Sequence, residues 1–280
     1  MTATKKHPDI SHEEFEFYSK EHQGKNMIIK VSGGEFQKIE FSQLINTIHL
    51  LLENDITIFL VFGGGIQINQ FYLQHLKDLK LPEIQRKKID GVGITTKNVL
   101  ETGVIPAYNF LIKKIENYFT DIPFSVNTVT TKNLEVSACI NSNKFGFVGN
   151  PKRINLNQSK NLHIIGFVGE DTTGQKFNVN ADEIAYTICK QQKIDEVVFI
   201  TGTGGILDNS GNIVSTISKE KLQNIINNKI SNITVSDGMQ KKCKEIFELL
   251  QIVPKIALAT SETLQHELFT KKGAGTLCLI

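Results

Sequence analysis

A lysine and two glycines stand where a strand would present groups to an anion. Lys30 closes the apolar run MIIKV and is followed by Ser32, Gly33 and Gly34. A buried strand accepts a cation when the ammonium group reaches an anion, so Lys30 is a candidate phosphate ligand. The alternative is that the strand has ended and the lysine extends into solvent.

Three consecutive glycines follow the next apolar run. ITIFLVF ends in Gly63, Gly64 and Gly65, and a helical pattern begins near Ile66. Glycines let backbone N–H groups approach an anion closely, and a helix N-terminus adds its positive dipole. The pattern favours a phosphate or oxyanion site, and a simple tight turn is the alternative.

Polar side chains also gather at the entry of a later helix. FNVNADEIA brings Asn178, Asn180 and Asp182 within five residues. One of them is expected to cap the helix. Because a single cap needs only one such group, at least one of the others is expected to face a ligand.

A second glycine-rich turn and a pair of lysines follow in the last third of the chain. The strand EVVFI leads into TGTGGILD, in which Asp208 could cap the turn or bind a hydroxyl group. Gly238 and Met239 then open a helix that carries Lys241 and Lys242 in its first turn. Cations there oppose the helix dipole, so a nearby anion explains them better than helix stability does, although two solvated lysines are the alternative.

Composition excludes several other classes of protein. The 31 basic and 29 acidic residues give a net charge of +2, too small to drive sequence-independent binding of nucleic acid. Gly169 to Lys176 only mimics a P-loop, and no dinucleotide fingerprint follows a strand. The four cysteines are far apart, which predicts reduced thiols in a cytoplasmic protein without a structural zinc site. The N-terminal segment has no apolar core, and Glu53, Asn54 and Asp55 interrupt the longest apolar stretches, so we expect no secretion signal and no membrane span.

The elements that must position these groups alternate along the chain. From Asn26 onward, short apolar runs alternate with amphipathic segments, which predicts a parallel sheet covered by helices. Residues 122–165 interrupt this alternation with short β-rich pieces, which we interpret as a hairpin-rich insert or lid. The second half resumes the alternation, so we expect two lobes that share a continuous sheet, preceded by a charged helix or arm.

The motifs together resemble those of the amino-acid kinase family, and within it the branch that acts on N-acetyl-L-glutamate. They are, in order, KVSGG, FGGGIQI, FNVNAD, TGTGGILD, DGMQKKC and HELFTKKGAGTL. The resemblance implies an α/β fold, a three-layer αβα sandwich with a mainly parallel central sheet. It implies an arm or helix over residues 1–24 and a kinase domain over 25–280, with the acyl substrate bound in about 25–178 and ATP in about 179–280.

The implied activity is ATP-dependent phosphorylation of a side-chain carboxylate of an N-acylated amino acid, most simply N-acetyl-L-glutamate in arginine biosynthesis. ATP and Mg²⁺ are the implied cofactors, small molecules the expected partners, and a homodimer or higher homo-oligomer the expected assembly. The implied catalytic residues are Lys30, Asp182 and Lys242. The implied substrate-binding residues are Gly63, Gly64, Gly65, Asn178 and Asn180, and the implied nucleotide-binding residues are Gly33, Thr201, Gly202, Thr203, Gly204, Gly205, Asp208, Gly238 and Met239.

One departure bears directly on the substrate. The family's DG-x-R-x-T segment carries an arginine that grips the α-carboxylate of the substrate, and here Gly93 stands in its place. Either Arg86 or Arg153 reaches in, a lysine substitutes, or the substrate differs. A catalytically degenerate domain that binds a metabolite or a partner as a regulatory module is the alternative from another class.

Overall fold

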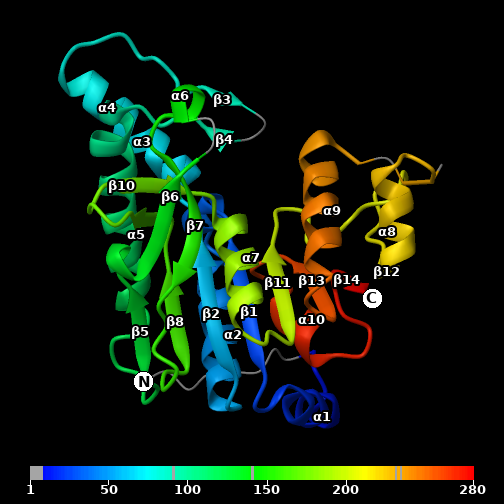
Figure 1. The fold of residues 1–280 in the computed structure, drawn as a ribbon. Helices are drawn as coiled ribbons and strands as arrows, with labels where there is room; N and C mark the ends of the chain where they lie inside the picture. Colours follow the sequence, from blue (N-terminus) through cyan, green and yellow to red (C-terminus); the bar gives the residue numbers. More distant parts are fainter. Residues whose placement is uncertain (1–8, 90–91, 140–141, 231, 234) are drawn as a thin grey trace. The chain divides into compact units, whose positions relative to one another are not determined.

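The computed structural model describes residues 9–89, 92–139, 142–230, 232–233 and 235–280 (Figure 1). The chain forms two compact units and passes between them four times. The first unit contains residues 1–31, 37–59 and 192–280, and the second contains residues 32–36 and 60–191. The two units differ in their bounds from the two expected lobes, which are distinguished by the ligand that each binds. The assignment of the acyl substrate to one lobe and of ATP to the other stays a prediction.

The first unit is built on a mainly parallel set of strands. In hydrogen-bonded order they are β1 (Asn26–Val31), β11 (Glu196–Ile200), β13 (Lys255–Ala259), β14 (Thr276–Leu279) and β12 (Thr216–Ser218). Only the β13–β14 pair is antiparallel among these. Ile28, Ile29 and Val31 of β1 are fully buried, as a parallel strand with both faces covered requires.

Helices of the first unit follow the apolar periodicity of the sequence. They are α1 (His12–His22), α2 (Phe41–Glu53), α8 (Lys219–Ile226), α9 (Asp237–Leu249) and α10 (Leu264–Phe269). The side chain of Ser11 caps α1 by accepting the N–H of Glu14 at 3.1 Å. The Phe15 ring then packs against Phe269 of α10, with 4.9 Å between the ring centroids. In Figure 1, α1 lies beside α10.

The second unit begins with a short 3-10 turn, η1 (Gly33–Gln37), and with the end of β2 (Thr57–Phe62), which crosses the boundary between the units. The helix α3 (Gly65–Asp78) follows, and then the hairpin of β3 (Lys88–Ile89) and β4 (Val92–Gly93). Next, α4 (Lys97–Val99) continues through a π turn, η2 (Leu100–Val104), into α5 (Ile105–Asn117). Pro106 at the start of α5 is tolerated because a helix needs no N–H there.

The remaining strands of the second unit form two groups. β5 (Val126–Val129) and β8 (Leu162–Ile165) pair in parallel. The strands β10 (Lys176–Val179), β7 (Val148–Ile154), β6 (Leu134–Ala138) and β9 (Val168–Glu170) form a small closed barrel. Three short helical elements accompany them: η3 (Thr131–Asn133), α6 (Ser142–Phe145) and α7 (Ala181–Gln191).

The hairpin-rich interpretation of residues 122–165 is wrong for β5. Among the described strands of this segment, β6 and β7 form the one antiparallel pair, whereas β5 pairs in parallel with β8, beyond the two barrel strands that separate them in the chain. Apolar composition does not distinguish the two kinds of pairing over such short runs. The α/β class with a large, mainly parallel sheet and helices is confirmed. Of the described helices, none has the length and apolar character needed to span a membrane.

Candidate functional site

The two predicted catalytic lysines both neighbour one aromatic residue of the first unit, Phe199. Lys30 of β1 is the register partner of Phe199 on the parallel strand β11, so the two side chains leave the same face of the sheet. Lys242 of α9 holds its Nζ 4.3 Å from the centroid of the Phe199 ring. The structure therefore places Lys30 beside Phe199 in the sheet and the Lys242 ammonium over the Phe199 ring.

The surroundings of Lys242 are aromatic and acidic. The Phe199 ring attracts the Lys242 ammonium through its π face, and Glu245 Oε2 lies 2.5 Å from Lys242 Nζ. An anion that bound both the Lys30 and the Lys242 ammonium groups would gain from their positive charge. Groups of this kind can stabilise the charge that develops on a transferring phosphoryl group.

The predicted nucleotide turn is fixed by bonds within the first unit. Thr201 Oγ1 accepts the N–H of Gly204 at 3.0 Å, and Gly204 has a positive φ of 74°. A Cβ on Gly205 would lie 2.5 Å from Thr276 Oγ1, which accepts the N–H of Ile206 at 2.9 Å. A Cβ on Gly202, by contrast, would meet open space. The turn is thus rigid where it packs and open where a ligand would approach.

Asp208 and the start of α9 behave as local structural groups. Asp208 Oδ1 accepts the N–H groups of Ser210 and Asn212, each at 2.9 Å, and these bonds lower the pKa of the carboxyl. The Ser236 side chain caps α9 by accepting the N–H of Met239 at 3.4 Å. Nucleotide roles for Asp208, Gly238 and Met239 stay predictions.

The position of Lys241 and Lys242 within α9 differs from the prediction. The helix begins at Asp237, so both lysines lie in its second turn rather than its first. The helix dipole acts mainly on the first turn, so it opposes these cations less than expected. The convergence of Lys242 and Lys30 at Phe199 is the stronger indication of an anion.

The two predicted glycine turns of the second unit are joined by a glutamine. Gln67 Nε2 donates to the carbonyl of Gly33 at 2.8 Å, and the Gln67 side chain is buried. A Cβ on Gly33 would lie 2.7 Å from Gln67 Oε1 and 3.1 Å from the carbonyl of Gly63. A Cβ on Gly64 would collide with the Phe167 ring, whereas one on Gly65 would meet open space. Gly65 therefore leaves the N-terminus of α3 accessible to a ligand.

Sequence reasoning missed Gln67, although a signal was present. The signal is a glutamine two residues after a glycine turn, at the start of α3. Once buried, its amide must find hydrogen-bond partners, and the Gly33 carbonyl supplies one of them.

The three polar residues before and within α7 have different surroundings. Asn180 Oδ1 accepts the N–H of Asp182 at 3.2 Å, so Asn180 caps the helix, as expected for one of the three. Asn178 instead donates from Nδ2 to Thr95 Oγ1 at 3.2 Å. Asp182 lies half-buried in the first turn of α7. Ligand contacts for all three stay predictions.

The loop that carries Gly93 is bonded to Arg86. Arg86 donates from Nη2 to the Gly93 carbonyl at 2.9 Å and from Nε to the Ile94 carbonyl at 3.0 Å. Asp90 and Gly91 of the same motif lie outside the described residues. Of the alternatives raised by the sequence, Arg86 is thus the arginine that reaches this loop.

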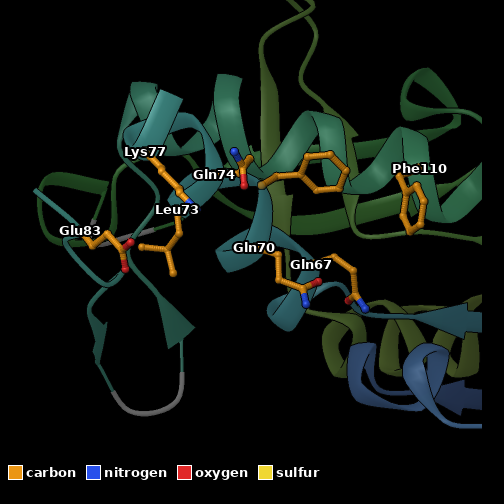
Figure 2. A pocket seen from close by; sticks show the side chains of 8 residues that line it. Gln67, Gln70, Leu73, Gln74, Lys77, Glu83 and Phe110 are labelled. Atoms are coloured by element: carbon orange, nitrogen blue, oxygen red, sulfur yellow. The ribbon is translucent and has the colours of Figure 1, made fainter. Parts of the chain in front are cut away.

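A surface pocket of about 580 Å³ lies along α3 in the second unit (Figure 2). Its lining residues come from α3, with Glu83 and Phe110 added, and none of them is a predicted site residue. Within the described residues, no three His, Cys, Asp or Glu side chains gather in a way that would hold a metal ion. Neither feature adds to the predicted site.

Comparison with known proteins agrees with the motifs. The model of the amino acid kinase family matches residues 25–255 of the chain. Acetylglutamate kinase from Xanthomonas campestris pv. campestris is 26% identical over 262 residues, which are 89% of this chain and 58% of that relative. Acetylglutamate kinase from Campylobacter hominis is 27% identical over 276 residues, which are 93% of both chains. The chain thus spans little more than half of the first relative and most of the second.

Solved structures show the same fold at low identity. N-acetylglutamate synthase from Neisseria gonorrhoeae, solved with coenzyme A and L-arginine, superposes with a TM-score of 0.79 at 16% identity. The match covers 95% of this chain and 64% of that chain. Carbamate kinase from Giardia lamblia, solved with citric acid, gives a TM-score of 0.63 at 13% identity, over 91% of this chain and 98% of that one.

Proposed function

The chain belongs to the amino acid kinase family, and we propose that it transfers the γ-phosphoryl group of ATP to a side-chain carboxylate of an N-acylated amino acid. N-acetyl-L-glutamate is the first candidate, since both bacterial relatives described above are acetylglutamate kinases. Its phosphorylation would serve arginine biosynthesis. A cytoplasmic homodimer or higher homo-oligomer belongs to the same proposal.

One observation carries the proposal, namely the convergence of Lys30 and Lys242 on Phe199. The transition state of phosphoryl transfer spreads negative charge over the transferring oxygens, and catalysis depends on positioning and on neutralising that charge. Two ammonium groups fixed on one face of a sheet supply such neutralisation.

The residues divide the work in a chemically balanced way. The substrate carboxylate is already ionised at neutral pH, so it attacks the γ-phosphorus without a general base, and ADP leaves. In the first unit, Lys30 and Lys242 balance the charge of the transferring group. In the second unit, the backbone N–H groups of Gly64 and Gly65 at the N-terminus of α3 are suited to bind an oxyanion.

Magnesium enters this proposal as a part of the nucleotide. Mg²⁺ prefers oxygen ligands and commonly bridges the phosphates of ATP while it keeps several waters. The described residues offer no cluster of three metal-ligating side chains. Mg²⁺ would be bound together with ATP, and it would neutralise charge on the phosphate oxygens.

The test compares two neighbouring lysines on α9. ADP release from Mg-ATP is measured with N-acetyl-L-glutamate, and beside it with glutamate, N-acetylaspartate and N-acetylaminoadipate. Lys242→Ala is expected to lower kcat by roughly 10²–10³-fold, the loss typical of removing one group that stabilises transition-state charge. Lys241→Ala, which alters an exposed residue of the same helix, should keep kcat within about twofold.

The outcomes separate the candidate functions. Selective turnover of N-acetyl-L-glutamate that depends on Lys242 supports the proposal. Selective turnover of another compound would mean that Gly93, in place of the family's arginine, changes the substrate specificity. Binding of ATP without any turnover would favour the regulatory module, which the altered loop at Gly93 suggests as a second candidate function.

A further inference from the structure

The space beside Gly93 is filled by the guanidinium of Arg86. A Cβ built on Gly93 would overlap the Nη2 and Cζ atoms of Arg86 and would lie 2.6 Å from its Nε. Any side chain at residue 93 would therefore displace the guanidinium. Gly93 is the residue that lets Arg86 occupy this position.

Three hydrogen bonds fix the guanidinium in a single orientation. Arg86 Nε donates to the Ile94 carbonyl at 3.0 Å, and Nη2 donates to the Gly93 carbonyl at 2.9 Å and to Thr95 Oγ1 at 3.3 Å. These bonds use the Nε and Nη2 atoms, whereas Nη1 appears in none of them. A guanidinium presents its N–H donors as a planar fork, so fixing one side also fixes the direction of the other.

The three described acceptors of Arg86 carry no charge. Two are backbone carbonyls and one is a hydroxyl, so within the described part of the chain all are neutral. The side chain is half-buried, and burial lowers the pKa of the guanidinium to about 10, which leaves it cationic at neutral pH. A partly desolvated cation with neutral partners gains more from an anionic ligand than a solvated one does.

A single hydroxyl links Arg86 to a predicted substrate residue. Thr95 is fully buried, and its Oγ1 donates to the Gly93 carbonyl at 3.2 Å. The same oxygen accepts from Arg86 Nη2 at 3.3 Å and from Asn178 Nδ2 at 3.2 Å. The hydroxyl is then saturated, so it holds the amide of Asn178 and the guanidinium of Arg86 in a fixed relation.

The other arginine is not available for the same task. Arg153 is exposed on β7, where its register partner on β6 is Glu135, a residue of opposite charge. A cross-strand pair of this kind accounts for Arg153 within the barrel.

We propose that Arg86, whose guanidinium occupies the space that a side chain at residue 93 would fill, binds the α-carboxylate of the acyl amino-acid substrate. This inference rests on the proposed function, because that function supplies the carboxylate. The guanidinium enters from outside the loop that carries Gly93, and Thr95 aligns it with Asn178. Arg86 is thus a specificity-determining residue rather than a catalytic one.

The test removes each partner of the contact in turn. The α-carboxylate is removed by replacing N-acetyl-L-glutamate with N-acetyl-4-aminobutyrate, which keeps the reacting carboxylate. The guanidinium is removed by Arg86→Gln, and Lys87→Gln serves as a neighbouring control. Arg86→Gln should raise the KM for N-acetyl-L-glutamate by about 10- to 100-fold, and leave kcat and the KM for ATP within about twofold.

The effect of the variant should depend on the substrate. For N-acetyl-4-aminobutyrate, the wild type and Arg86→Gln should have the same KM, since the carboxylate that Arg86 binds is gone. An equal loss with both substrates would mean that Arg86 only supports the loop, and it would overturn the proposal. Gly93→Ala gives an independent arm, because its Cβ displaces the guanidinium and should reproduce the selective rise in KM.

Failure of this inference is distinguishable from failure of the proposed function. Calorimetric binding of N-acetyl-L-glutamate needs no turnover, so it tests Arg86 even in a chain without kinase activity. Binding by the wild type that weakens in Arg86→Gln supports the contact whether or not ADP is released. Equal affinity of the two proteins overturns the role of Arg86, whatever the activity of the wild type.

Discussion

At the scale of single residues, the imidazole of His163 illustrates how burial controls a proton. His163 lies on β8, is 2% exposed, and has its Nδ1 3.2 Å from Asn127 Nδ2. Burial lowers the pKa of the ring from 6.5 to about 4, against a smaller opposing effect of the Lys160 backbone. The folded protein therefore keeps this histidine neutral at a pH at which the unfolded chain protonates it.

The sign of the resulting pH dependence follows directly. Between the two pKa values the unfolded chain binds a proton that the folded chain does not, so stability falls as the pH falls. Between about pH 7 and about pH 5, His163 should cost roughly 2 kcal/mol of unfolding free energy. Urea unfolding of the wild type and His163→Gln at both pH values measures it, and the variant at neutral pH gives the cost of repacking. Equal losses of stability in the two proteins would disprove this account.

At the scale of elements, α1 is tied to the end of the chain by a few contacts that can be tested separately. Phe15 stacks on Phe269, and Glu14 Oε1 accepts the N–H of Lys271 at 3.2 Å. His22 Nε2 lies 2.9 Å from the carbonyl of Leu268. The first helix thus depends on residues that come last in the sequence.

Removal of one aromatic ring should loosen this docking. Phe15→Ala is expected to lower the unfolding free energy by about 1–2 kcal/mol, since the ring is half-buried and stacked. Phe17→Ala is the matched control, because Phe17 is 58% exposed on the same helix and should change stability by less than about 0.5 kcal/mol. Hydrogen exchange of α1 amides should accelerate in the first variant only, and protection equal to wild type in Phe15→Ala would contradict the docking role.

The helices and strands also show which parts of the fold the sequence predicts and which it does not. The helix from Phe41 to Glu53 is predictable because its apolar residues have helical spacing, and because the polar residues Asn54 and Asp55 mark its C-terminal end. The parallel pairing of β5 with β8 is not predictable, since it joins short runs separated by the barrel strands.

The candidate site shows the same division. The candidate lysines and glycines could be found from the sequence, because a lysine in an apolar strand and consecutive glycines after a strand are unusual. The role of Arg86 depends on a missing Cβ at Gly93, and that of Gln67 on a carbonyl 34 residues away. Such relations arise only when the chain is folded, so no local pattern contains them.

At the scale of the whole molecule, ligand binding should appear as stability. The proposed function requires that Mg-ATP binds the folded chain and not the unfolded one, so ATP should raise the unfolding free energy by mass action. At about 100 times its dissociation constant the gain is about 2.7 kcal/mol, which should raise Tm by a few degrees. A thermal shift with Mg-ATP measures it, and Lys242→Ala should shift less at the same concentration. A Tm that ATP leaves unchanged would contradict the assignment of a nucleotide site.

The pairing of β1 with β11 also governs the order in which the protein can fold as it is made. Asn26 bonds to Asp195, 169 residues later, and α1 contacts residues beyond 264. Residues 60–191, by contrast, make up nearly all of the second unit in one continuous stretch. During translation this stretch leaves the ribosome with its partners already present, whereas the apolar strand 26–31 gains β2 as one neighbour early and β11 as the other only after residue 196 has been synthesised. One edge of β1 is therefore unpaired for much longer than the strands within residues 60–191 are, and an unpaired strand edge is a site at which chains aggregate.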